Sequence, residues 1–89
     1  MPYIRKKDRE KYEACITYIV QELEKLPMEK AEGELNYIIS RILKLLYRTK
    51  PKYFNYNRMV GLLECVKLEA YRRWVAEYDD EKIKENGDI

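Results

Sequence analysis

Paired carboxylates are the residues of this sequence that come closest to a catalytic motif. Glu29 and Glu32 are three residues apart, and Glu64 and Glu69 are five apart. All-α nucleotide pyrophosphohydrolases hold Mg²⁺ with Glu-x-x-Glu and Glu-x-x-Asp pairs on adjacent helices. A spacing of five separates Glu64 from Glu69 by about 140° around a helix, so these carboxylates do not converge on one ion. Acidic side chains near the start of a helix, such as Glu29 and Glu32, also stabilise its dipole. A metal-dependent hydrolase is therefore the weakest of three hypotheses.

The carboxylates of the third helical segment have basic neighbours at ion-pair spacing. Lys67 follows Glu64 by three residues, and Arg72 and Arg73 follow Glu69 by three and four. Because this spacing brings side chains together on a helix surface, we predict structural ion pairs among these five residues. Lys67 lies at the edge of an apolar stripe, which leaves two interpretations. It is either a Lys whose stem covers apolar surface while its head stays in water, or a partly buried partner of Glu64 that fixes helix register at a subunit interface.

Basic and aromatic side chains alternate around a loop in the middle of the chain. Further basic residues lie along the preceding predicted helix at spacings of three and four residues. Nucleic-acid bases stack on aromatic rings while Lys and Arg contact phosphate, so this pattern predicts a nucleic-acid patch. No recognised DNA- or RNA-binding motif accompanies it. The members of this basic-aromatic patch are Arg41, Lys44, Arg48, Lys50, Lys52, Tyr53, Phe54, Tyr56 and Arg58.

Nucleophilic catalysis has little support in the sequence. There is no His to act as a base, and Ser40 and Thr17 lie in helical segments without a partner. Two Cys residues without His cannot form a Cys/His zinc site in one chain. Cys15 and Cys65 lie in apolar stretches, which favours buried reduced thiols over a disulfide between helices. We therefore predict no catalytic residue, no metal ligand and no cofactor, and a function other than catalysis.

Three predicted helices position these residues. The first covers residues 8–26, with Asp8 as its N-cap and Pro27 at its end. Its apolar residues recur at spacings of three and four and cover an arc of about 140°. The members of this stripe are Tyr12, Cys15, Ile16, Ile19, Val20, Leu23 and Leu26.

The second and third predicted helices, residues 30–48 and 56–78, are apolar on more than one side. The apolar residues of the second helix cover about 200° of its circumference. The third helix, capped by Asn55 or Asn57, carries two apolar stripes. They are Met59, Leu62, Leu63, Val66, Ala70 and Trp74 on one side and Val60, Leu68, Tyr71 and Val75 on another. Residues 79–89 are predicted to be a solvated tail or one short helical turn that ends at Asn86-Gly87.

Length and composition predict one small all-α domain, a three-helix domain over residues 1–89. The chain has 46% hydrophobic residues but only three Gly and three Pro, too few for the turns of a sheet protein. The formal charge of +2 means that phosphate binding would need a local patch. Without a signal peptide or an apolar run of roughly 20 residues, we expect a soluble, cytoplasmic protein with no membrane partner. The many Lys, Glu and Tyr and the single Gln are also common in hyperthermophile proteins.

Several segments of the chain resemble a known family. They are Gly-Glu-Leu-Asn-Tyr at residues 33–37, Leu-Glu-x-x-Lys-x-Glu-x-Tyr-Arg-Arg at 63–73, the segment 78–82 and, most distinctive, Glu-Asn-Gly-Asp at 85–88. Here and at Met1-Pro2-Tyr3-Ile4, the sequence is similar to a family of short prokaryotic and phage proteins, a domain of unknown function. The resemblance implies no activity, cofactor or partner.

Two hypotheses of different classes rank above the hydrolase. The first is a non-enzymatic helical protein that self-associates as a homo-oligomer and works as an interaction or structural module. It rests on the excess of apolar surface on the second and third helices, which only two other helices of the chain could cover. The alternative is a nucleic-acid or ribonucleoprotein accessory protein that binds through the basic-aromatic patch.

Overall fold

The computed structural model describes residues 2–49 and 52–89, and this part of the chain contains helices and no strand. The all-α class predicted from the sequence is therefore confirmed. The chain divides into two compact units, which are described separately. The N-terminal unit comprises Met1–Pro51 and the C-terminal unit Lys52–Ile89.

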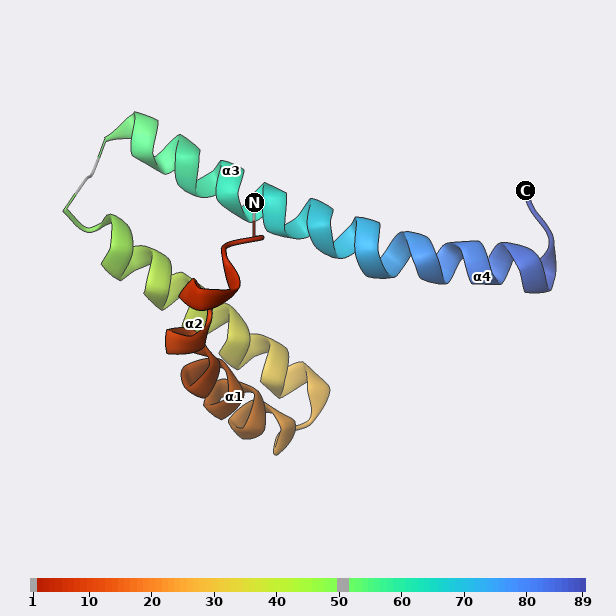
Figure 1. Cartoon of the computed structure of the whole chain (residues 1–89), viewed down its shortest axis with the longest axis horizontal. Coiled ribbons are helices and arrows are strands. Elements are labelled where there is room, and N and C mark those ends of the chain that lie inside the picture. Colours follow the sequence, from red (N-terminus) through yellow and green to blue (C-terminus); the bar gives the residue numbers. More distant parts are fainter. Residues whose placement is uncertain (1, 50–51) are drawn as a thin grey trace. The chain divides into compact units, whose positions relative to one another are not determined.

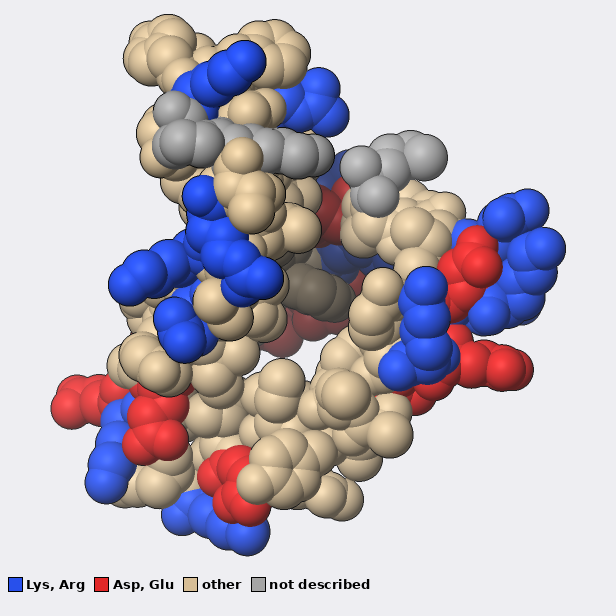
Figure 2. Space-filling view, turned by 90° about the vertical axis from the view of Figure 1, so that its left-hand side faces the viewer, with Lys and Arg blue, Asp and Glu red and all other residues tan. Residues whose placement is uncertain are grey.

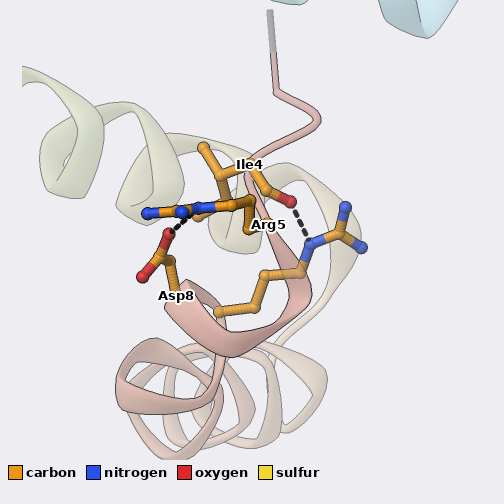
Figure 3. A network of polar contacts seen from close by, with 4 residues as sticks. Ile4, Arg5 and Asp8 are labelled. Carbon is orange, nitrogen blue, oxygen red and sulfur yellow. Dashed lines mark hydrogen bonds and ion pairs between the residues drawn. The ribbon is translucent and has the colours of Figure 1, made fainter.

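A short 3-10 turn, Lys6–Asp8, precedes helix α1 (Glu10–Glu24). The Arg5 side chain donates a hydrogen bond from Nε to Asp8 Oδ2 at 3.1 Å, and Arg9 Nε donates to the Ile4 carbonyl oxygen at 2.8 Å (Figure 3). The expected N-cap at Asp8 is wrong, because this carboxylate pairs with Arg5 inside the preceding turn. Arg9 occupies the N-cap position instead, without a side-chain capping bond, and the helix begins at Glu10.

Helices α1 and α2 (Met28–Tyr47) form a hairpin around Pro27, as Figure 1 shows. Proline has no N–H to satisfy, and at this N-cap its carbonyl oxygen accepts the Ala31 N–H at 2.9 Å. The second helix begins at Met28, close to the start expected near residue 30. The two helices pack against each other, with Ile19, Leu23 and Ile38 among the half-buried side chains.

The C-terminal unit is one continuous helix made of three parts. Helix α3 (Tyr53–Ala70) passes into a π-helical turn, Tyr71–Val75, and then into α4 (Ala76–Asn86) without a break (Figure 1). The helix begins at Tyr53 rather than at residue 56, because the carbonyl oxygen of Lys52 accepts the Tyr56 N–H at 3.0 Å. The expected caps, Asn55 and Asn57, consequently lie inside the helix.

The segment predicted to be a solvated tail or one short helical turn is helical as far as Asn86, and the expected stop at Asn86-Gly87 is confirmed. Polar contacts support it locally: Lys82 Nζ lies 3.0 Å from Glu85 Oε2 and 5.5 Å from the centre of the Tyr78 ring. The helix ends where Gly87 adopts a φ of 89° and donates its N–H to the Ile83 carbonyl oxygen at 2.8 Å. Only glycine adopts such a φ readily, which explains the end of the helix at this residue.

None of the described residues is fully buried. Half-buried side chains of the N-terminal unit lie on both α1 and α2, and most large apolar side chains of the C-terminal helix are exposed. A folded domain of this size normally has a buried core. Each unit therefore presents apolar surface that its own elements do not cover.

Candidate functional site

The α2 part of the basic-aromatic patch surrounds a shallow hollow. Arg41 and Lys44 line an open space of about 370 Å³ together with Tyr37 and Ser40. Spacings of three and four place these four side chains on one face of the helix. The hydroxyl of Ser40 donates a hydrogen bond to Asn36 Oδ1 at 3.3 Å. Tyr37 and Ser40 were not among the predicted site residues, although their spacing from Arg41 and Lys44 could have indicated them.

The α3 part of the patch lies in the first turns of that helix rather than in a loop. Tyr53 and Phe54 expose 80% and 67% of their surface. The Arg58 guanidinium carbon lies 5.7 Å from the centre of the Phe54 ring, within the range of a cation–π contact. Tyr56 is also exposed, so this end of the helix presents rings and a cation to solvent.

The patch is thus distributed over two units. Arg41 and Lys44 lie together on α2, and Phe54 and Arg58 lie together on α3. Arg48 directly follows α2, Lys52 directly precedes α3, and Lys50 falls outside the described residues.

Charge is segregated along the sequence around this patch. The segment 35–63 contains six Lys and Arg residues and no Asp or Glu. Figure 2 shows Lys and Arg side chains in the upper left part of one face, whereas basic and acidic side chains are mixed lower down and at the right. A concentration of positive charge of this kind attracts phosphate and other anions.

Ion pairs connect the charged residues of the C-terminal helix. Lys67 Nζ lies 3.2 Å from Glu64 Oε1, and Arg72 Nη2 donates to Glu69 Oε1 at 2.8 Å. Both side chains of the first pair are more than half exposed, so the described chain does not bury this pair. The Glu69 carboxylate is better covered, with 23% of its side chain exposed. Arg73 lies in the π-helical turn.

A further pair at the end of α1 affects protonation. Lys25 Nζ donates to Glu22 Oε2 at 2.9 Å. This hydrogen bond, followed by the attraction between the two charges, lowers the pKa of Glu22 and raises the pKa of Lys25. Both groups lie at the surface, where the pair supports the last turn of α1.

Both cysteines are free and exposed, which corrects the expectation of buried thiols. Cys15 on α1 and Cys65 on α3 lie on helix faces that no other element of the same unit covers. Within residues 2–49 and 52–89, no three His, Cys, Asp or Glu side chains gather as a metal site would require. None of the described helices combines the length and the apolar character needed to cross a membrane.

The comparison with known proteins identifies a family and no activity. Neither the curated proteins nor the solved structures include a significant match to the chain. A family model matches residues 1–89. It confirms the resemblance predicted from the segments around Gly33, Leu63 and Glu85. The chain therefore belongs to the family described as a domain of unknown function, DUF6899.

Proposed function

We propose that this protein is a non-enzymatic helical interaction module that works as a homo-oligomer. The observation that carries this proposal is the lack of a buried residue in the described chain, combined with the exposure of large apolar side chains in both units. Apolar surface of this extent marks a site of association in soluble proteins.

The distribution of apolar residues explains why the helices of each unit leave apolar surface exposed. Helix α2 packs on α1, yet Leu35, Ile39, Ile42 and Leu46 form a second stripe at spacings of four, three and four that stays exposed. The C-terminal helix has apolar residues on two sides. Each unit therefore has apolar surface that its own elements leave exposed. Further copies of the chain would cover this surface, and closed homo-oligomers are the commonest assemblies.

Sedimentation velocity at micromolar concentrations tests this proposal. We expect a mass that is a multiple of 10.9 kDa and that decreases on dilution. A mass of 10.9 kDa at every concentration would show that the apolar stripes are covered within one chain, and the proposal would be wrong.

A second candidate function is binding of single-stranded nucleic acid through the basic-aromatic patch. The observation that favours it is the segment 35–63, where six cations occur without an acidic residue and exposed rings stand beside them. Cations of this segment would contact phosphates, while Tyr53 and Tyr56 would offer faces for bases to stack on.

Fluorescence polarisation with a labelled oligonucleotide tests this second function. Binding should weaken steeply as salt rises, with a slope that decreases when Arg41 and Lys44 are both changed to Ala. The matched control changes Lys82 and Lys84 to Ala, because these cations lie among acidic residues and should not contact phosphate. Equal affinity of both double variants, or no binding in 50 mM salt, would contradict it.

A further inference from the structure

The apolar residues of α3 follow the spacing of a coiled coil. Met59, Leu63, Val66 and Ala70 are separated by four, three and four residues, the alternation of core positions in a heptad repeat. In an uninterrupted α-helix the next two core positions would be residues 73 and 77, which are Arg73 and Glu77. Read as a regular heptad, the apolar seam would end at Ala70.

The π-helical turn changes this result. A π turn closes its hydrogen bonds over one more residue than an α turn, so it delays the later residues by one position, roughly 100° around the axis. Beyond Tyr71–Val75 the core positions therefore move from residues 73 and 77 to Trp74 and Tyr78. One extra residue, absorbed by the π turn, keeps the apolar seam on one side of the helix. We call Met59, Leu63, Val66, Ala70, Trp74 and Tyr78 the heptad seam.

Nothing within the C-terminal unit covers the heptad seam, because that unit contains no second helix. Val66, Trp74 and Tyr78 expose 58%, 67% and 57% of their surface. An apolar seam with heptad spacing, kept in phase by the π turn, is the side of a helix that packs against another helix of the same periodicity.

The charges beside the seam indicate a second copy in parallel orientation. With Ala70 and Tyr78 at position a, Glu69 and Glu77 occupy position g, and Lys67 and Lys82 occupy position e. In a parallel pair, position g of one helix faces position e five residues later on the other, which places Glu77 opposite Lys82. An antiparallel pair would face the acidic flank with an acidic flank and the basic flank with a basic flank, so like charges would repel.

We propose, as a deepening of the proposed function on which it rests, that two copies of this chain associate through their heptad seams in parallel. The π turn keeps the heptad seam on the same side of the helix beyond residue 70. The exposed apolar stripe of α2 is not part of this interface and stays available for contacts with other helices.

The central experiment compares Val66→Asp with Leu68→Asp by sedimentation equilibrium of the full chain. The two positions expose 58% and 55% of their side chains and lie two residues apart, but only Val66 belongs to the heptad seam. We expect Val66→Asp to raise the dimer dissociation constant at least tenfold more than Leu68→Asp. Circular dichroism of both variants verifies their helix content. A dimeric wild type with equal effects of the two changes would overturn this inference and leave the proposed function standing, whereas a monomeric wild type would overturn both.

A cross-linking measurement tests the orientation of the two copies. In a chain with Cys15→Ser and Cys65→Ser, the change Tyr78→Cys should give a disulfide-linked dimer on mild oxidation, because parallel core positions lie within disulfide range. An antiparallel pair would separate the two thiols by tens of ångströms and give no such dimer, which would exclude the parallel arrangement.

The π turn has its own test. Deleting Arg73 removes the extra residue, so the turn should become α-helical while Trp74 and Tyr78 stay in phase with Ala70. The dissociation constant should change less than threefold. Inserting one Ala after Arg73 should instead move Trp74 and Tyr78 out of phase and weaken the dimer at least tenfold. Equal effects of deletion and insertion would show that the π turn does not carry the seam.

Discussion

At the scale of single residues, ion pairs three positions apart recur through both units. Besides those of Glu64 and Glu69, they join Arg5 to Asp8, Glu22 to Lys25 and Lys82 to Glu85. Each connects one turn of helix to the next, and each lies at the surface, where water and salt screen the charges. These pairs support the helices locally.

Lys67→Ala should lower the free energy of unfolding only slightly, by about 0.2–0.5 kcal/mol, because its pair with Glu64 is exposed. Urea unfolding at a dilution where the protein is monomeric measures this. A loss of several kcal/mol would mean that Lys67 is partly buried after all.

Added Mg²⁺ should not change the melting temperature of the protein. A stabilisation by Mg²⁺ that disappears in Glu64→Gln would favour the hydrolase hypothesis instead.

The Glu22–Lys25 pair should make stability depend on pH. The lowered pKa of Glu22 means that the pair stabilises the folded chain above the ordinary, unfolded-state pKa of this carboxyl group, and that this support is lost as the pH falls through the folded-state pKa. Thermal melts of Glu22→Gln and the wild type should therefore differ at pH 7 and coincide near pH 2. The neighbouring change Glu24→Gln is the control. A difference that persists at pH 2 would assign the effect to something other than this charge.

At the scale of elements, the positions of the helices could be predicted from the sequence, but the residues at which they begin could be predicted less well. Spacings of three and four located all three helices, because apolar stripes follow the geometry of the helix itself. The expected caps at Asp8, Asn55 and Asn57 were wrong, since none of α1, α2 and α3 begins with a side-chain capping bond. Pro27 and Lys52 occupy the N-cap positions of α2 and α3, where their carbonyl oxygens accept the first helical N–H bonds as in any helix, and neither is a residue type that marks a cap.

The π turn and the full length of the C-terminal helix show what the sequence could not reveal, although the helix stop at Asn86-Gly87 was predicted. No residue type marks the position where a helix takes up one extra residue, so Trp74 seemed to end its stripe. Residues 79–86 are strongly polar, and their helix depends on local pairs and on a glycine stop rather than on apolar periodicity. In the basic-aromatic patch, spacing within one helix predicted which residues share a face, as for Arg41 and Lys44. Spacing along the sequence does not predict contacts between residues of different helices.

The glycines of these elements should respond differently to substitution. Gly33 and Gly61 lie inside helices with no heavy atom within 4 Å of an added Cβ, so Gly33→Ala and Gly61→Ala should each stabilise the chain by about 0.5–1 kcal/mol. Gly87→Ala should instead destabilise by about 1 kcal/mol, because φ is 89° there. Thermal unfolding of the three variants measures both signs; stabilisation by Gly87→Ala would contradict the helix end seen at that residue.

At the scale of the whole molecule, stability should depend on protein concentration. If apolar side chains are covered only in an assembly, association and folding are linked by mass action, and the melting temperature rises with concentration. Differential scanning calorimetry over a hundredfold range of concentration tests this. A chain that folds completely by itself would melt at one temperature throughout, contrary to our expectation.

The lack of a buried residue also has a consequence for the life of the chain in a cell. A newly made copy displays its apolar side chains to proteases and chaperones until it meets another copy, and meeting is a second-order event whereas degradation of the lone chain is first-order. Assembled protein should then accumulate more steeply than in proportion to its rate of synthesis. Halving the rate of synthesis would remove more than half of the assembled protein. The assembly would therefore accumulate only above a certain level of expression.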